Sequence, residues 1–331
     1  MNHVEVWLCD ASLGPDTRIG HLFATAGRSV DSVRFEYDNA WLAGTEAPTP
    51  FDLEPALQAY PGPHFPPAGS SLFGIFRDAS PDRWGRVLME RREIIEAKEA
   101  RRPARTFGEW EFLLGVADQG RMGALRLRDP ESGVFVEDRP LPVPPVARLR
   151  ELEAVAVELD TPGVEDRPEY RDWLLQLTAP GTSLGGARPK ATYQDVDGSL
   201  WLAKFPAHDD RRNIGLWECL AATLACECGI TMPPFRTHMF SGRGHTFAVQ
   251  RFDRVGPSRR LYASAMTLAG KNEGEPASYL DITEIIETQG EQGQIDADLE
   301  QLFRRVLFSI LIGNRDDHLR NHGFLRGRTG W

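Results

Sequence analysis

Residues 306–321 read VLFSILIGNRDDHLRN and join an apolar segment to a short charged turn. Hydrophobic residues recur in and just before this stretch at steps of three and four, which predicts a helix that buries one full stripe: Leu299, Leu302, Phe303, Val306, Leu307, Ile310 and Leu311. Gly313 is expected to end that helix. Residues 313–321 hold five ionisable side chains, so we expect a charged loop that is anchored to a rigid core element.

Two polar residues of this loop fit parts that phosphoryl transfer to a hydroxyl group requires. That reaction needs a carboxylate to accept the hydroxyl proton, a divalent metal on the phosphates, and positive charge where negative charge develops. Arg315, Asp316, four further residues and Asn321 follow the R-D-x-x-x-x-N order of a kinase catalytic loop. Asp316 would be the base and Asn321 a magnesium ligand. The alternative is a solvated turn that is rich in Asp and Asn.

A second set of residues lies upstream, in a predicted hairpin and helix. The dipeptide at residues 197–198 is a strong hairpin signal, and Lys204 is expected near the end of the second strand. The helix that follows, from about Asn213 to a stop at Gly229, carries Glu218. This order is typical of the lysine that holds ATP phosphates and of the glutamate that orients it. A solvated strand-end lysine and a solvent-facing glutamate are the alternatives.

Just before the hairpin, residues 181–190 read GTSLGGARPK. The stretch is neither a G-x-G-x-x-G motif nor a Walker A loop, because Ala187 follows Gly186 where a Walker A loop has lysine. Its glycines still allow backbone N–H groups to approach an anion, and Lys190 follows closely. By spacing alone the stretch is only a turn.

A metal-dependent phosphohydrolase is a further reading of the charged loop. Asp316, Asp317 and His318 are all possible metal ligands. Adjacent residues rarely point at one ion, however, and no second cluster at ligand spacing appears in the sequence. For His318, a hydrogen bond that braces the loop is an equally good interpretation.

The composition limits the classes of protein. The chain has 331 residues, of which 41% are hydrophobic and 26% charged, as in globular proteins, and no apolar run approaches the ~18 residues that a membrane helix needs. A net charge of −10 makes nucleic acid an unfavourable direct partner. The N-terminus lacks the layout of a signal peptide, so we expect a cytoplasmic location.

Patterning along the chain predicts an α+β protein. Alternating hydrophobic residues at 4–8 and 32–37 predict strands in a β-rich domain over residues 1–105, which ends in a helix with Ser80 as N-cap and Pro81 at its first position. Residues 106–148 are expected to connect the domains through a proline-rich linker, and residues 149–331 to form the second domain. Its small mixed lobe would extend to about residue 255, followed by a helical lobe over residues 256–331.

Several segments, in this order, resemble the HipA toxin-kinase family. They are SLFGIFRDASPDRWGR (71–86), GRMGALRLR (120–128), TSLGGARPK (182–190), AKFP (203–206), AVQRFDR (248–254), YASAMTL (262–268) and GNRDDHLRN (313–321). The resemblance spans nearly the whole chain. It implies an N-terminal β-rich domain and a protein-kinase-like core related to phosphatidylinositol kinases, with a mixed small lobe and a helical large lobe.

The resemblance also implies a role for each residue. Asp316 is similar to the catalytic base, Asn321 to a metal ligand, and Lys204, supported by Glu218, to the phosphate-binding lysine. Ser183 resembles the loop serine that such kinases autophosphorylate; a phosphate there adds roughly −1.5 to −2 charge and should eject the loop. The residues that would contact ATP are Gly185, Gly186, Ala187, Arg188, Lys190, Lys204, Gln250, Arg251, Phe252 and His318.

The family resemblance implies activity and partners as well. It implies an ATP- and Mg²⁺-dependent serine/threonine kinase of toxin-antitoxin type that phosphorylates a translation component such as an aminoacyl-tRNA synthetase. A small helix-turn-helix antitoxin, HipB-like, would restrain it. Contact with DNA would be only indirect, through that antitoxin, and no membrane partner is expected.

One departure from the family pattern leaves open an alternative to an active kinase. Members carry a second metal-binding aspartate shortly after the strand that begins near residues 322–325, and further large-lobe helices, whereas residues 1–331 include neither. A magnesium ion held by Asn321 and phosphates alone should bind poorly, and part of the helical core should be exposed. The alternative to a kinase is therefore a fragment or a truncated, inactive copy that binds antitoxin or nucleotide without catalysis.

Overall fold

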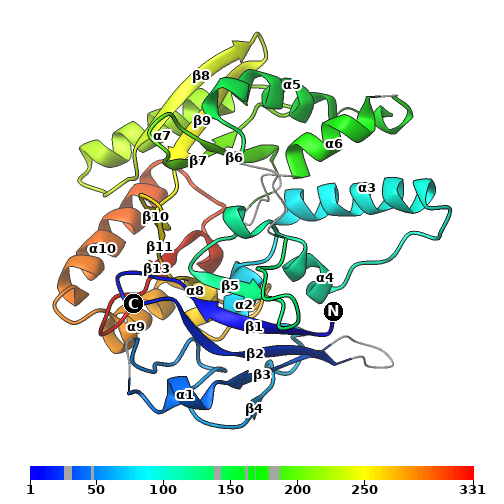
Figure 1. Ribbon diagram of the computed structural model, residues 1–331. Helices are drawn as coiled ribbons and strands as arrows, with labels where there is room; N and C mark the ends of the chain where they lie inside the picture. Colours follow the sequence, from blue (N-terminus) through cyan, green and yellow to red (C-terminus); the bar gives the residue numbers. More distant parts are fainter. Residues whose placement is uncertain are drawn as a thin grey trace.

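The computed structural model describes residues 1–25, 32–45, 48–137, 143–159, 161, 163–167, 169–178, 186 and 188–331. They form an α+β fold in which a five-stranded antiparallel sheet and a four-stranded antiparallel sheet lie at opposite ends of the molecule, with helices between them (Figure 1). The predicted fold class is confirmed.

The N-terminal sheet has the strand order β4-β3-β2-β1-β5. Its strands are β1 (His3–Leu8), β2 (Thr17–Thr25), β3 (Ser32–Tyr37), β4 (Pro63–His64) and β5 (Leu125–Arg128). On β1 and β3 every second side chain is buried, as their alternating sequences predict for a sheet with one covered face. β5 lies within the segment that was expected to connect the domains, and it pairs with β1 at the edge of this sheet.

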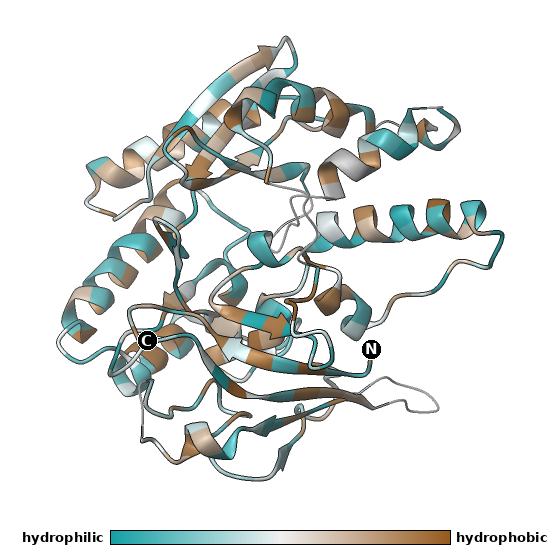
Figure 2. Ribbon diagram, in the orientation of Figure 1, coloured by the Kyte–Doolittle hydropathy of each residue, from teal (hydrophilic) through white to brown (hydrophobic). Residues whose placement is uncertain are grey.

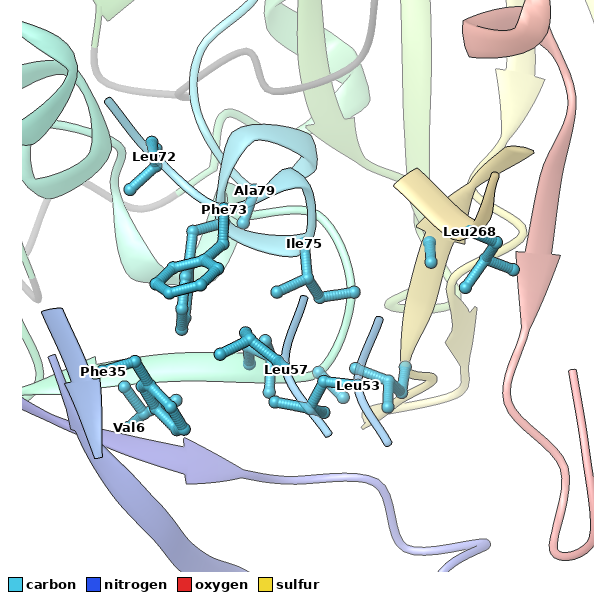
Figure 3. Close-up of a cluster of buried hydrophobic side chains, with 14 of the residues drawn as sticks. Val6, Phe35, Leu53, Leu57, Leu72, Phe73, Ile75, Ala79 and Leu268 are labelled. Atoms are coloured by element: carbon cyan, nitrogen blue, oxygen red, sulfur yellow. The ribbon is translucent and has the colours of Figure 1, made fainter. Parts of the chain in front are cut away.

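The covered face of the sheet packs on α2 (Gly74–Asp78) through a cluster of fully buried side chains. Figure 3 shows Phe35 and Val6 from the sheet opposite Phe73 and Ile75 of the α2 segment, with Leu53 and Leu57 between. Leu268 of α8 (Ala265–Leu268) extends the same cluster into the C-terminal half. The N-terminal sheet and the C-terminal helices therefore share one core.

Helix α3 (Arg83–Glu99) begins two residues later than predicted. Its N-cap is Asp82, whose carboxylate accepts a hydrogen bond of 2.7 Å from the N–H of Gly85. Ser80, the predicted N-cap, instead donates its hydroxyl to the carbonyl of Phe76 at 2.9 Å and so closes the end of α2. Ser and Asp are comparable N-caps, so the end of the preceding helix decides which of them is used.

The second sheet has the order β6-β7-β9-β8. Its strands are β6 (Lys190–Gln194), β7 (Leu200–Lys204), β8 (Phe235–Ser241) and β9 (Gly244–Gln250), and the predicted hairpin at residues 197–198 joins β6 to β7. Helices α5 (Leu149–Leu159) and α6 (Tyr170–Thr178) cover one face. Trp84 and Leu88 of α3 complete that hydrophobic core, so a helix of the N-terminal half packs against the small lobe.

Helix α7 (Ile214–Glu227) follows β7, as the sequence predicts, and it packs against β9. The helix and the strand lie very close together at Gly215, where an added Cβ would lie 1.9 Å from the carbonyl oxygen of His245. Asn213 caps the helix and also accepts from the N–H of His245 at 2.9 Å. Glycine at this position therefore sets how close Glu218, one turn later, comes to the sheet.

The remaining helices lie beside the N-terminal sheet. They are α9 (Tyr279–Gln289) and α10 (Ile295–Leu311). Before them in the chain come the paired strands β10 (Arg254–Val255) and β11 (Ser258–Arg259) and then β12 (Tyr262–Ser264), which pairs with β13 (Gly323–Leu325) after α10. Short helices complete the fold: α1 (Asn39–Leu42), α4 (Glu109–Leu114) and the 3₁₀ turns η1 (Asp118–Gly120), η2 (Val146–Arg148), η3 (Val164–Asp166) and η4 (Leu319–Asn321).

The prediction that α10 buries one full hydrophobic stripe is wrong. Leu302 is buried and Leu299 and Val306 pack on the core, but Phe303, Leu307, Ile310 and Leu311 are exposed, the last by 82%. Helix periodicity identifies an apolar face, and here only part of that face is covered by the rest of the described chain.

α7 also has an apolar outer face, at Leu216, Trp217, Leu220 and Leu224. Figure 2 shows the hydrophobic residues on both helices.

Within the described residues, no helix has the length and apolar character needed to span a bilayer.

We predict that Gly215→Ala lowers the free energy of unfolding. The new methyl group collides with the backbone of β9, and overpacking costs about 1–3 kcal/mol, which exceeds the helix preference of alanine of about 1 kcal/mol. Urea unfolding measures the difference. Gly242→Ala is the control, because a Cβ added there meets no described atom within 4 Å. Equal stabilities for the two variants would contradict this account of the helix–sheet contact.

Candidate active site

The charged loop after α10 is held in shape by its own polar groups. Gly313 has a φ of +70° and ends the helix, as predicted. Asn314 accepts a hydrogen bond of 3.2 Å from the N–H of Asp316, and the side-chain amide of Asn321 donates to the carbonyl of Asp316 at 2.6 Å. The structure therefore brings Asp316 and Asn321 together. The Asp316 side chain itself is 94% exposed.

Asp317 ties the loop to two other elements. Its carboxylate accepts from the hydroxyl of Tyr279 on α9 at 2.7 Å and lies 2.8 Å from Nε2 of His322. Although burial alone would raise the pKa of Asp317, the hydrogen bond from Tyr279 and the neighbouring His322 lower it below its usual value. The same hydrogen bond raises the pKa of Tyr279 to about 12. Asp317 is thus a brace that fixes the backbone next to Asp316.

The phosphohydrolase reading finds no support in this geometry. Asp317 is engaged by Tyr279 and His322, whereas Nε2 of His318 lies 3.8 Å from the Asp316 carboxylate on the exposed side of the loop. Among the described residues, no group of three or more His, Cys, Asp or Glu side chains is placed to hold a metal ion. The His318 side chain is 56% exposed, so it can face a ligand at the loop surface.

Lys204 and Glu218 form an ion pair between the end of β7 and α7. Each side chain is 30% exposed, and the Lys204 ammonium also lies 5.6 Å from the ring centre of Phe247 on β9. An ammonium group has three donors. Since Glu218 takes one of them and holds the side chain in place, the others can bind a phosphate.

The glycine-rich stretch is described only at its exit. Ser183, Gly185 and Ala187 lie outside the described residues. Gly186 has a φ of +107°, a left-handed conformation that favours glycine. Arg188 forms a double hydrogen bond with Asp210 at 2.7 and 2.6 Å, and this ion pair raises the pKa of Arg188. Lys190 is buried, with its ammonium 2.6 Å from the Asp82 carboxylate. Its side chain points into the protein.

Residues 250–252 connect the small lobe to the rest of the chain. The N–H of Gln250 donates to the carbonyl of Pro234 at 2.8 Å and that of Arg251 to the carbonyl of Leu200 at 2.9 Å, so both backbones are held at the end of β9. The Phe252 side chain is 43% exposed and lies 5.4 Å from the Tyr262 ring. Gln250 and Phe252 can therefore contact a ligand, whereas the Arg251 side chain cannot, because it is only 1% exposed and paired with Asp253.

Asp253 is the centre of a buried charge network. It accepts from two nitrogens of Arg251 at 2.9 and 2.7 Å, from Arg254, and from the N–H of Gly123 at 2.8 Å. Burial alone would raise the pKa of Asp253, but the charges of Arg251 and Arg254 outweigh it and hold that pKa well below the usual range. Arg251 also donates to the carbonyl of Gly120 at 2.7 Å. The network fastens the connection between the lobes to the loop before β5.

The elements that carry the Lys204–Glu218 pair and the segment that follows the charged loop lie on opposite sides of the lobe connection. Figure 1 shows the four-stranded sheet and α7 above, the segment of β13 below, and β10 and β11 between them. Comparison with known families assigns this part of the chain: residues 182–331 match the HipA-like C-terminal domain. Residues 182–331 are similar to the HipA-like C-terminal domain.

For residues 182–331, the match confirms the family resemblance that the motifs predicted. The structure of HipA from Shewanella oneidensis MR-1, solved as a toxin-antitoxin complex with HipB and operator DNA, is similar to this one with a TM-score of 0.62 and 18% sequence identity. The match covers 99% of this chain and 73% of that chain, so the likeness in fold includes the N-terminal half. No curated protein matches the sequence.

The HipA-like domain offers oxygen ligands for a magnesium ion at one place. The side-chain amide nitrogen of Asn321 donates to the backbone carbonyl of Asp316, which leaves the side-chain oxygen of Asn321 available to an ion. Mg²⁺ prefers such oxygen ligands and completes its shell with water and phosphate oxygens. A single side-chain oxygen from Asn321 is a weak site on its own, so an ion bound here would take most of its shell from water and phosphate oxygens.

Sequence reasoning missed two buried carboxylates that tie the HipA-like domain to the N-terminal half. Asp253 lies within the quoted motif AVQRFDR, and Asp82 within SPDRWGR, but neither was singled out. Their partners are Gly123 and Lys190, which lie more than a hundred residues away in the chain. An aspartate next to two arginines was the only available signal for Asp253.

We predict that Asp253→Asn destabilises the protein by about 3 kcal/mol, because removing one partner leaves buried arginines uncompensated. The pKa of Asp253 is depressed by folding, so its contribution is fully present above the unfolded value of about 4 and is lost as pH falls through the folded pKa. The difference between wild type and variant should be constant from about pH 5 to 8 and shrink below about pH 4.

Chemical denaturation across this pH range measures the difference. Asp197→Asn is the matched control, since Asp197 only accepts from Ser199 in an exposed turn. A pH-independent difference, or an equal loss in the control, would contradict the central place of Asp253.

Proposed function

We propose that this chain acts as an ATP- and magnesium-dependent serine/threonine protein kinase of toxin-antitoxin type. The observation that carries the proposal is the Lys204–Glu218 ion pair across β7 and α7. A glutamate on the helix after the strand orients the lysine toward the phosphates in protein kinases. The HipA-like C-terminal domain and the similar fold of a solved HipA support the assignment.

Asp316 serves as the base in this proposal. A general base must reach the hydroxyl group of an incoming substrate, and the exposed Asp316 carboxylate meets that requirement. Its position is set through the backbone, because Asn314 and Asn321 bind its N–H and carbonyl groups. Asp316 takes the proton of the hydroxyl group as its oxygen bonds to the terminal phosphorus of ATP, and the bond from that phosphorus to the bridging oxygen breaks and releases ADP.

Lys204, Asn321 and the lobe connection hold the nucleotide. Lys204 places positive charge on the phosphates, where negative charge accumulates. Asn321 would hold Mg²⁺, which when bound neutralises charge on the phosphate oxygens. The backbone of residues 250–252 and the Phe252 ring would contact the adenine base, and Gly186, Arg188 and His318 would lie near the phosphates.

The remaining assignments follow from the family. Ser183 is the proposed autophosphorylation site, and a translation component such as an aminoacyl-tRNA synthetase is the proposed substrate. A HipB-like helix-turn-helix protein is the proposed antitoxin, supported by the HipB and operator DNA in the solved HipA complex. A net charge of −10 fits contact with DNA through such a partner rather than directly.

We predict that Asp316→Asn lowers phosphate transfer by roughly 10²–10⁴-fold, the usual contribution of a general base, without a change in ATP affinity. The measurement is transfer of label from ATP with magnesium to the chain itself and to a protein mixture. Asp129→Asn, at an exposed turn that Asp129 closes with Ser132, is the control and should transfer at the wild-type rate.

Intact mass then separates the two main hypotheses. A wild-type chain that binds ATP but gains no phosphate on Ser183 and labels no protein would favour the non-catalytic alternative. Release of phosphate from simple esters, independent of Lys204, would instead favour a phosphohydrolase.

We predict that Lys204→Met raises the Kd for ATP about 10- to 100-fold, since a hydrogen bond to a charged group contributes about 1.5–3 kcal/mol. Isothermal titration with ATP and magnesium measures the loss. Lys98→Met is the matched control, because Lys98 is exposed at the last turn of α3. Unchanged affinity in Lys204→Met would remove the main support for a nucleotide site between β7 and α7.

A further inference from the structure

The buried Lys190 joins three parts of the chain. Its ammonium lies 2.6 Å from the carboxylate of Asp82 and donates to the carbonyl of Gly186 at 2.8 Å. The Lys190 and Asp82 side chains are 2% and 3% exposed. Asp82 is also the N-cap of α3 through its other oxygen. One hydrogen-bonded chain therefore runs from the N-terminal half, through Lys190, to the exit of the glycine-rich stretch.

This arrangement removes Lys190 from the set of phosphate ligands. Its ammonium is enclosed and two of its donors are used inside the protein. Burial lowers the pKa of Lys190, while the charge of Asp82 opposes that effect. A lysine so placed acts on a nucleotide only through the backbone that it holds.

The backbone that Lys190 holds is that of Gly186. A Cβ added at Gly186 would lie 3.2 Å from the Lys190 nitrogen, so the left-handed turn and the close approach both require glycine. On the other side of residue 187, Arg188 is fixed by Asp210. The exit of the stretch is thus anchored at two points, one of them in the N-terminal half.

α3 is a suitable support for such an anchor. Trp84 and Leu88 at its start belong to the hydrophobic core of the small lobe, together with Leu152 of α5 and Tyr193 of β6. Arg86 on the same turn forms a double hydrogen bond with Glu109 at 2.6 and 2.7 Å, which ties α3 to α4. Asp82 therefore sits where the small lobe meets the N-terminal domain.

We propose that Asp82 and Lys190 are positioning residues that hold the backbone at Gly186 and at residues 188–190 in the arrangement required for nucleotide binding, so that the N-terminal domain contributes to the ATP site. The inference rests on the proposed function. It assigns to a residue outside the HipA-like C-terminal domain a direct part in shaping that domain's loop.

The test compares Asp82→Asn, Lys190→Met and the double variant in the full chain. Asn is as good an N-cap as Asp, so α3 keeps its start. Each single variant leaves one charge buried without its partner and should lose stability, whereas the double variant removes both charges and should regain much of it. Thermal unfolding follows stability, titration with a fluorescent ATP analogue follows binding, and amide hydrogen exchange follows residues 186–190.

We expect the double variant to bind the nucleotide roughly tenfold more weakly than wild type, the equivalent of one lost hydrogen bond, although its stability is restored. Exchange at residues 186–190 should be faster without nucleotide. A purely structural pair predicts the opposite, that affinity and exchange return to wild-type values together with stability, and that result would overturn the proposal.

The outcome also separates this proposal from the kinase assignment. If the wild-type chain binds no nucleotide, the proposed function fails, and the hydrogen exchange of residues 186–190 alone decides whether Asp82 and Lys190 hold the loop. Lys98→Met paired with Asp197→Asn is the control, since it removes the same two charges from exposed positions and should change neither measurement.

Discussion

The buried carboxylate of Asp253 is the constraint on which the arrangement of the two lobes depends. It lies directly after the residues that connect the small lobe to the rest of the chain, and it binds Arg251, Arg254 and the backbone of Gly123 at once. A carboxylate with no exposed surface requires partners on every side, because leaving it unpaired in the interior costs several kcal/mol. The connection between the lobes is therefore held by hydrogen bonds to the N-terminal half as well as by its own strands.

The same principle recurs along the whole boundary between the halves. Aspartates of the N-terminal half accept hydrogen bonds from the C-terminal half: Asp10 from the N–H of Leu261, Asp78 from the N–H of Ser264 and the hydroxyl of Thr267, Asp82 from Lys190, and Asp118 from Arg259. All four carboxylates are buried or nearly so. Together with the hydrophobic cluster that includes Leu268, they make the β-rich half a structural part of the candidate active site.

Elements that depend on local pattern could be predicted from the sequence. β1, β3, the hairpin at residues 197–198 and α7 follow from alternation, turn residues and a cap, and the order of Lys204 and Glu218 was enough to predict their pairing. The buried charge pairs could not be predicted in this way. Asp82 and Lys190 are 108 positions apart, and the sequence around one of them gives no signal that it pairs with the other. Exposure of the α10 face was missed for a related reason: periodicity shows which side of a helix is apolar, but only the tertiary structure shows what covers it.

The Asp316 side chain is exposed, yet its backbone is held in place by neighbouring residues. Its own side chain makes no buried contact, which leaves the carboxylate open to a substrate hydroxyl and to water that carries the proton away. The placement comes from its neighbours: Asn314 and Asn321 bind its backbone, and Asp317 fastens the next residue to α9 and to His322 just before β13. Ala265, at the start of α8, in turn donates its N–H to the carbonyl of His322, so the loop rests on the core that the N-terminal sheet completes. Rigidity at the site is therefore supplied by backbone hydrogen bonds that lead into the shared core, and the exposed carboxylate needs no partner of its own.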